Sequence, residues 1–139
     1  MRFGAIFSAL LWAIFSFPAF ALTITFDPGG RIDAYEARWQ QLARSGETVR
    51  IDGLCGSACT LLTGLVPRNR VCVTSRATLL FHAAHDGTGV MSQNGTAELM
   101  RVYPAGIRSW IGANGGLTSP QRHIRLAGAE LRSFYRACP

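Results

Sequence analysis

The chain has 139 residues, a formal net charge of +6 and 48% hydrophobic residues, which suits one domain rather than two. Its fourteen basic residues are all arginine, so a serine–lysine dyad and Schiff-base chemistry are excluded. After Arg2 the arginines are scattered from Arg31 to Arg136 without a concentrated basic stripe, so we expect no nucleic-acid partner.

The N-terminus has the pattern of a secretory signal peptide. Arg2 precedes an apolar run over residues 3–17, and Ala19-Phe20-Ala21 matches a small-residue cleavage site. An uncleaved membrane anchor is the alternative, but it needs about 20 apolar residues, and Pro18 with its small neighbours favours cleavage. We therefore expect a signal peptide over 1–21, one domain over 22–139, and export to the periplasm or the cell exterior.

The first half of the mature chain alternates strands and helices. Residues 22–26 alternate apolar and polar side chains as in a half-buried strand, and Asp27-Pro28-Gly29-Gly30 is turn chemistry. Apolar residues recur at helical spacing over 31–45, before Gly46. The next predicted elements are a strand over 48–52 that ends at Gly53 and a short helix over 58–62.

The second half continues the alternation. Strands are predicted over 71–74 and 78–81, followed by a polar loop over 83–94. A helix is predicted over 96–113, which Pro104 kinks or splits, and a short final helix over 130–137. This order of elements indicates an α/β layered domain.

Three features of the first half could carry chemistry, and each has an ordinary alternative. Ser57 lies in IDGLCGSACTLL at the predicted start of a short helix, where a serine is also a common helix cap. His82 follows a strand, where catalytic groups of open α/β sheets gather, although a buried structural histidine fits there too. Gly29-Gly30 can expose backbone N–H groups, or can simply form a turn.

Together these motifs resemble the Clp-protease proteolytic-subunit family of the Clp/crotonase fold. The resemblance covers residues 27–84: Pro28-Gly29-Gly30 before a helix, Gly53-Leu54-Cys55-Gly56-Ser57-Ala58 around the serine, and His82 at a strand end, 25 positions (82 − 57) after Ser57. It implies a small, N-terminally shortened Clp/crotonase-like layered sheet with flanking helices.

The resemblance also implies a site. It makes Ser57 the nucleophile and His82 the general base of a serine peptidase or other hydrolase. Gly30 and Ala58 would donate oxyanion N–H groups, with Gly29 supporting the turn. It further implies a peptide or acyl substrate, no cofactor, no metal and assembly into a homo-oligomer.

The chain departs from the family in its third catalytic residue. The family has a late aspartate, but the acids after His82 here are Asp86, Glu98 and Glu130. Glu130 lies at about the right distance and is a weak candidate, whereas the better-matching segment, 122–127, contains no acid. The family's strands before the Pro-Gly-Gly strand are also missing.

The cysteines Cys55, Cys59, Cys72 and Cys138 form an even set in a predicted exported chain, which indicates two disulfides. Of the three pairings that the sequence allows, we expect Cys59–Cys72 with Cys55–Cys138.

Three functions therefore stand as alternatives. The first is an exported serine hydrolase, and the second is a non-catalytic Clp/crotonase-fold envelope protein used for binding or assembly. The third and weakest is a metal or redox site built from His82, His85, Cys55 and Cys59.

Overall fold

The computed structural model describes residues 22–139, so the signal peptide expected over 1–21 lies outside the described residues. Within 22–139, none of the helices has the length and apolar character needed to cross a membrane.

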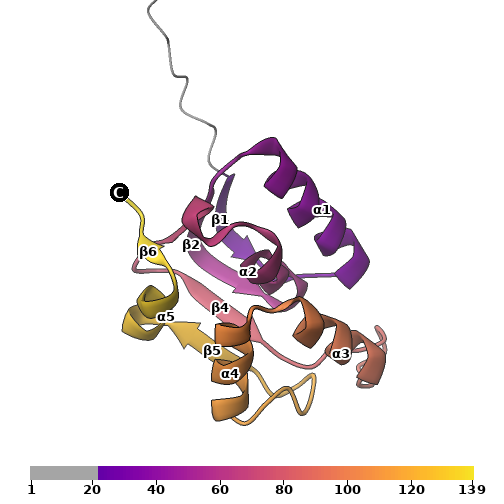
Figure 1. Ribbon diagram of the computed structural model, residues 1–139. Coiled ribbons are helices and arrows are strands. Elements are labelled where there is room, and N and C mark those ends of the chain that lie inside the picture. Colours follow the sequence, from indigo (N-terminus) through magenta and orange to yellow (C-terminus); the bar gives the residue numbers. More distant parts are fainter. Residues whose placement is uncertain (1–21) are drawn as a thin grey trace, which may run out of the picture.

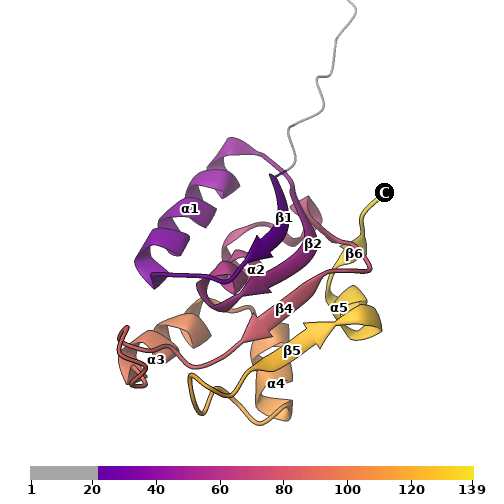
Figure 2. The same cartoon turned by 180° about the vertical axis from the view of Figure 1, so that it is seen from behind.

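The centre of the molecule is a largely parallel β-sheet (Figures 1 and 2). Its central strand is β2, which pairs with β1 along one edge, and with β3 and then β4 along the other. β6 continues the sheet parallel to β3, and β5 closes the opposite end antiparallel to β4. The strands are β1 (Leu22–Asp27), β2 (Val49–Gly56), β3 (Val71–Val73), β4 (Thr78–Phe81), β5 (Ile124–Ala127) and β6 (Arg136–Ala137).

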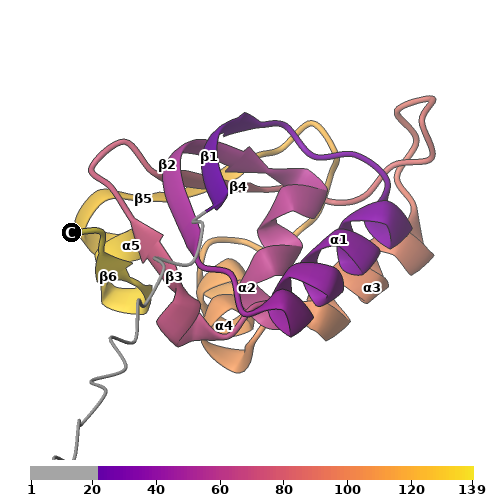
Figure 3. The same ribbon diagram turned by 90° about the horizontal axis from the view of Figure 1, so that it is seen from above.

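The helices α1 to α4 gather on one side of this sheet (Figure 3). The buried strand residues Ile24, Ile51, Leu79 and Leu126 belong to the same core cluster as the buried helix residues. The helical elements are α1 (Ile32–Ser45), η1 (Ser57–Leu61), α2 (Leu62–Leu65), η2 (Arg68–Arg70), α3 (Gln93–Val102), α4 (Ala105–Ala113) and α5 (Gly128–Phe134). The predicted α/β layered fold class is therefore confirmed.

The predicted helix over 31–45 is confirmed as α1, with the buried face and the terminal glycine that the sequence predicts. Trp39 and Leu42 are buried and lie one turn apart, and Ile32 and Tyr35 pack partly against the same core. Gly46 ends the helix in the left-handed conformation, with a φ of 81°, which glycine adopts without a steric penalty.

Gly53 does not end β2, contrary to the prediction. The strand continues to Gly56, and its register with β1 shifts between Ile24 and Phe26. A Cβ atom at Gly53 would lie 1.9 Å from the carbonyl oxygen of Thr25. The glycine is there because the bulged neighbouring backbone comes too close for any side chain.

The second half differs from the prediction in its strands. Of the two predicted effects of Pro104, the structure shows the split: Pro104 separates α3 from α4, because its ring cannot continue the hydrogen bonding of a helix interior. β5 and β6 were not predicted, and the final helix ends at Phe134. Both strands are short and rely on their neighbours in the sheet for their hydrogen bonds.

All four cysteines are in disulfides, but the predicted pairing is wrong. The bonds are Cys55–Cys59, with Cα atoms 5.4 Å apart, and Cys72–Cys138, with Cα atoms 4.9 Å apart. The unpredicted β6 explains the second bond, because it pairs with β3 and so brings Cys138 beside Cys72. Cys55 and Cys59 then face each other across the turn from β2 into η1.

Candidate functional site

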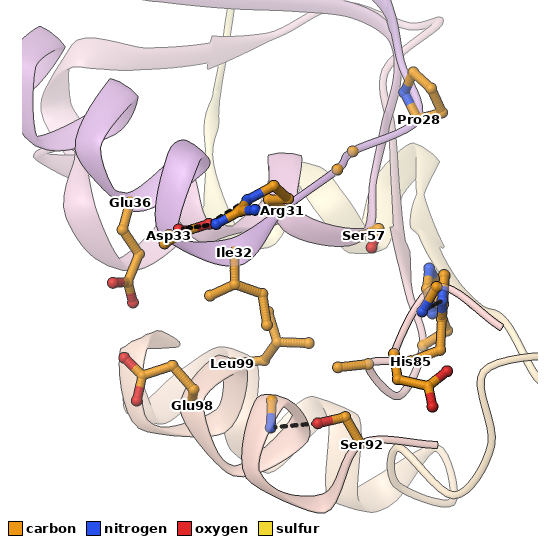
Figure 4. Close-up of a pocket in the computed structure, with 17 residues that line it drawn as sticks. Pro28, Arg31, Ile32, Asp33, Glu36, Ser57, His85, Ser92, Glu98 and Leu99 are labelled. Atoms are coloured by element: carbon orange, nitrogen blue, oxygen red, sulfur yellow. Dashed lines mark hydrogen bonds and ion pairs between the residues drawn. The ribbon is translucent and has the colours of Figure 1, made fainter. Parts of the chain in front are cut away.

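Three parallel strands end at the same edge of the sheet, and each is followed by a residue predicted for the site. The pairing of Asp27 with Cys55 and of Gly56 with Leu80 aligns the carboxyl ends of β1, β2 and β4. Carboxyl ends of parallel strands are where open α/β sheets place their ligands. A pocket of about 840 Å³ opens here, and its lining includes Gly29, Gly30, Ser57 and His82 (Figure 4).

Ser57 is in a strained backbone conformation. Its φ is 53°, and it is the one non-glycine residue among 22–139 with a positive φ. Left-handed geometry costs a residue with a Cβ atom about 1–2 kcal/mol. Such strain persists only where the surrounding structure imposes it. Here the turn from β2 into η1 imposes it, and the Cys55–Cys59 bond spans that turn.

The hydroxyl of Ser57 does not cap the helix, so the ordinary alternative for this serine is wrong. The N-cap of η1 is Gly56, and no side chain caps it. Ser92, in the same pocket, shows what a capping serine does: its Oγ accepts the Gly95 N–H at 3.1 Å. Within residues 22–139, the Ser57 hydroxyl takes part in no comparable bond, which leaves it free to meet a ligand.

Gly29 is the residue that lets the first turn approach Ser57. Its φ is 87°, and an added Cβ would lie 2.6 Å from both the Gly56 carbonyl oxygen and Ser57 Cβ, and 2.8 Å from the Ala58 nitrogen. The Gly29 N–H donates to Asp27 Oδ1 at 3.0 Å. Because that hydrogen is already used, Gly29 is not free to bind an oxyanion; its part is to make the close approach.

The other two predicted oxyanion donors have free N–H groups. Gly30 lines the pocket, and Ala58 is the second residue of η1, where N–H groups have no partner inside the helix. Neither N–H donates a hydrogen bond to any residue in the described chain. Oxyanion stabilisation requires N–H groups that are unoccupied before substrate arrives, and these two meet that condition.

Asp27 organises the glycine turn, a role that sequence reasoning missed. Its carboxylate accepts hydrogen bonds from the Gly29 N–H, from Arg38 Nη1 at 2.9 Å and from the Tyr35 hydroxyl. Burial, and then the bond to Asp27, raise the pKa of Tyr35 to about 12. The signal in the sequence is Asp-Pro-Gly, since an aspartate often bonds the backbone two residues later.

His82 is partly buried at the end of β4, in the same pocket as Ser57. Its Nδ1 lies 2.8 Å from the Ala83 carbonyl oxygen. A carbonyl can only accept, so Nδ1 carries the hydrogen and Nε2 is left with a free lone pair. No hydrogen bond joins His82 to Ser57 in the part of the chain that the structure describes.

The surroundings of His82 disfavour its protonated form. Burial lowers its pKa from the ordinary value, and charge on His123 and His85 lowers it further, whereas the bond to the Ala83 carbonyl opposes this. A neutral imidazole can accept a proton, as a general base must.

Glu130, the weak candidate for the orienting acid, lies elsewhere. It is in the first turn of α5, where its Oε1 accepts the indole N–H of Trp110 at 2.6 Å. It does not line the pocket.

The far end of the pocket holds two carboxylates, which share Arg101 as an ion-pair partner. Figure 4 shows the carboxylates of Glu36 and Glu98 on the side away from Ser57, with Ile32 and Leu99 between. Burial first, and then the neighbouring Glu98, raise the pKa of Glu36. A ligand that extends from Ser57 along this pocket therefore passes an apolar wall before it meets carboxylates.

The metal or redox alternative loses half of its expected ligands. Cys55 and Cys59 are bonded to each other and cannot act as thiolates. Among residues 22–139, no group of three or more His, Cys, Asp or Glu side chains is arranged to hold a metal ion.

Comparison with known proteins returns solved structures only. No family model matches the chain, and no curated protein matches it. A ClpP1 mutant from Listeria monocytogenes is 15% identical with a TM-score of 0.46, over 82% of this chain and 69% of that one. A peptidase from Plasmodium falciparum is 9% identical with a TM-score of 0.49, over 82% of this chain and 71% of that one. Both are likenesses of fold alone, and neither assigns an activity to this chain.

Proposed function

We propose that the protein is a serine hydrolase that cleaves a peptide bond or another acyl bond, with Ser57 as nucleophile and His82 as general base. The observation that carries the proposal is the state of Ser57. Its backbone is strained and its hydroxyl is free, and it lies in a pocket that His82 also lines. A serine with no task beyond the turn would gain from replacement by glycine.

In the proposed reaction, Ser57 Oγ attacks the carbonyl carbon of the substrate while its proton moves to His82 Nε2. The developing oxyanion receives hydrogen bonds from the N–H groups of Gly30 and Ala58. His82 then returns the proton to the leaving group, which leaves an acyl-enzyme on Ser57. Water, activated by the same imidazole, hydrolyses that ester.

The missing carboxylate sets the expected level of activity. In serine hydrolases an aspartate orients the histidine and stabilises the imidazolium, and losing this effect lowers kcat about 10⁴-fold. Here the Ala83 carbonyl fixes the tautomer of His82 but brings no negative charge. We therefore expect a slow hydrolase.

Export belongs to the same proposal. The predicted signal peptide over 1–21 and the two disulfides support a single domain, 22–139, that works in the periplasm or outside the cell. The homo-oligomer implied by the resemblance stays a prediction.

The test is covalent labelling with a fluorophosphonate probe, read by mass spectrometry on folded, oxidised protein. We expect one label, on Ser57, that is lost in Ser57→Ala and slowed at least about a hundredfold in His82→Gln. Ser75→Ala is the matched control, because Ser75 is exposed and does not line the pocket. Failure of the folded chain to react, or equal labelling of Ser57→Ala, would reject the proposal.

A non-catalytic binding protein is the second candidate. It is favoured by the lack, within 22–139, of a hydrogen bond between Ser57 and His82, and of a carboxylate on the imidazole. In that case Ser57→Ala retains the full biological function, whereas Cys59→Ser loses it through misfolding.

A further inference from the structure

The chain has three histidines: His82 and His85 line the pocket with Ser57, and His123 packs against His82. His82 is near both of the others: its ring centroid is 4.8 Å from that of His123 and 6.3 Å from that of His85. The His82 and His85 rings are stacked, with an interplanar angle of 16°. The candidate general base therefore has two imidazole neighbours.

The register of the sheet produces the closer of these two contacts. β4 and β5 are antiparallel, and Phe81 pairs with Ile124. Continuing this register by one residue places His82 directly opposite His123, and side chains at opposite positions lie on the same face. The register of β4 and β5 therefore brings the two histidines together at the end of the strand pair.

Two groups define the orientation of the His82 ring. The Ala83 carbonyl accepts from Nδ1, which fixes the tautomer, while the ring of His123 packs against it at an angle of 32°. We infer that His123 is a positioning residue that holds the imidazole of His82 for proton transfer, in the absence of an orienting carboxylate. This inference rests on the proposed function.

The same contact couples the charges of the two rings. A positive charge on His123 opposes protonation of His82, and charge on His85 acts in the same direction more weakly. The other charged groups on the surrounding elements have partners elsewhere. Asp86 accepts a hydrogen bond from Thr88, Arg122 donates to two backbone carbonyls, and Arg125 donates to Thr78. Arg31 forms an ion pair with Asp33, and Arg101 forms one with Glu98. The two neighbouring histidines are therefore the groups whose positive charge lowers the pKa of His82.

The test follows the rate of fluorophosphonate labelling of Ser57 as a function of pH in the full mature chain. His123→Ala removes the packing ring, and His123→Phe keeps a ring without charge. We expect His123→Ala to slow labelling about ten- to a hundredfold at pH 8, the scale of a small misplacement of a catalytic group. We expect His123→Phe to keep most of the labelling rate at alkaline pH. The acid limb of its pH–rate profile, where labelling slows as His82 is protonated, should move to higher pH. His123 is exposed, so both variants should fold.

His85→Phe is the matched control, since its ring is farther from His82, and its acid limb should move less than that of His123→Phe. An acid limb that stays in place in His123→Phe, or a His123→Ala protein that labels at the normal rate, would overturn the inference.

A second measurement separates this inference from the proposed function. NMR titration of the His82 ring in Ser57→Ala protein, with and without His123→Phe, reports the coupling without any reaction. If the chain never labels but the His82 titration moves to higher pH in His123→Phe, the hydrolase is rejected and the coupling stands. If Ser57 labels while neither His123 variant changes the rate or the titration, only the inference about His123 is rejected.

Discussion

Gly29→Ala tests whether the close approach of the first turn to Ser57 builds the site. Alanine at this position must adopt a φ of 87°, which costs a residue with a Cβ atom about 1 kcal/mol or more. Its methyl group would also lie under 3 Å from the Gly56 carbonyl oxygen, Ser57 Cβ and the Ala58 nitrogen. Two of these three atoms are backbone, so the turn itself has to move.

The two costs can be added to estimate the loss of stability. Overpacking of a tight site typically costs 1–3 kcal/mol, so together with the backbone term the free energy of unfolding should fall by about 2–4 kcal/mol. For a domain of roughly this size, 1 kcal/mol corresponds to about 4 °C in Tm, which gives a drop of about 8–16 °C. Because the turn carries Gly30, the Gly30 N–H moves away from Ser57, and labelling of Ser57 should be lost even well below the lowered Tm.

Alanine substitutions at two other glycines separate the cost of the backbone conformation from the cost of the steric contact. Gly87 has a φ of 93° with nothing within 4 Å of an added Cβ, so Gly87→Ala should show the backbone cost alone, about 1 kcal/mol. Gly30 has no positive φ, and an added Cβ would meet only the ring of Tyr35 at 3.2 Å, so Gly30→Ala should fold nearly normally. Urea unfolding of the three variants gives the comparison. A Gly29→Ala protein that is no less stable than Gly87→Ala, and still labels, would refute the reasoning.

Three further predictions concern the same pocket. Ser57→Gly should be more stable than Ser57→Ala by about 1 kcal/mol in urea unfolding, because glycine adopts a φ of 53° freely; equal stabilities would show that Ser57 is not strained. Asp27→Asn should slow Ser57 labelling and lower the pKa of Tyr35 from about 12 toward its ordinary value, measured by ultraviolet titration; an unchanged tyrosine titration would contradict the role of Asp27. Glu36 has a raised pKa in the folded chain, so the folded state binds the extra proton and stability falls as pH rises through the window between its unfolded and folded pKa values. Glu36→Gln should remove that fall, because burial and Glu98 no longer oppose a charged group at this position; thermal unfolding at pH 4 and pH 7 measures the change, and an unaltered pH dependence would reject it.

The sequence by itself determined the local elements whose pattern is complete within a few residues. The alternation over 22–26 predicted β1, the apolar spacing from Ile32 to Leu42 predicted α1, and Pro104 marked the break between α3 and α4. The glycines, the serine and the histidine at strand ends also pointed to one edge of the sheet, because parallel strands align their carboxyl ends. These signals depend on backbone sterics and on burial, which neighbouring residues largely set.

Tertiary structure alone decided the features that join distant segments. β6 is two residues long and exists only because β3 offers it hydrogen bonds, so the Cys72–Cys138 bond could not be read from the spacing of the cysteines. The φ of Ser57 follows from the path of the chain between β2 and η1, and no propensity of serine predicts it. His123 contacts His82 because of the β4–β5 register, and a pairing between residues 41 positions apart (123 − 82) leaves no local pattern, since its free energy comes from strands that meet only in the folded chain.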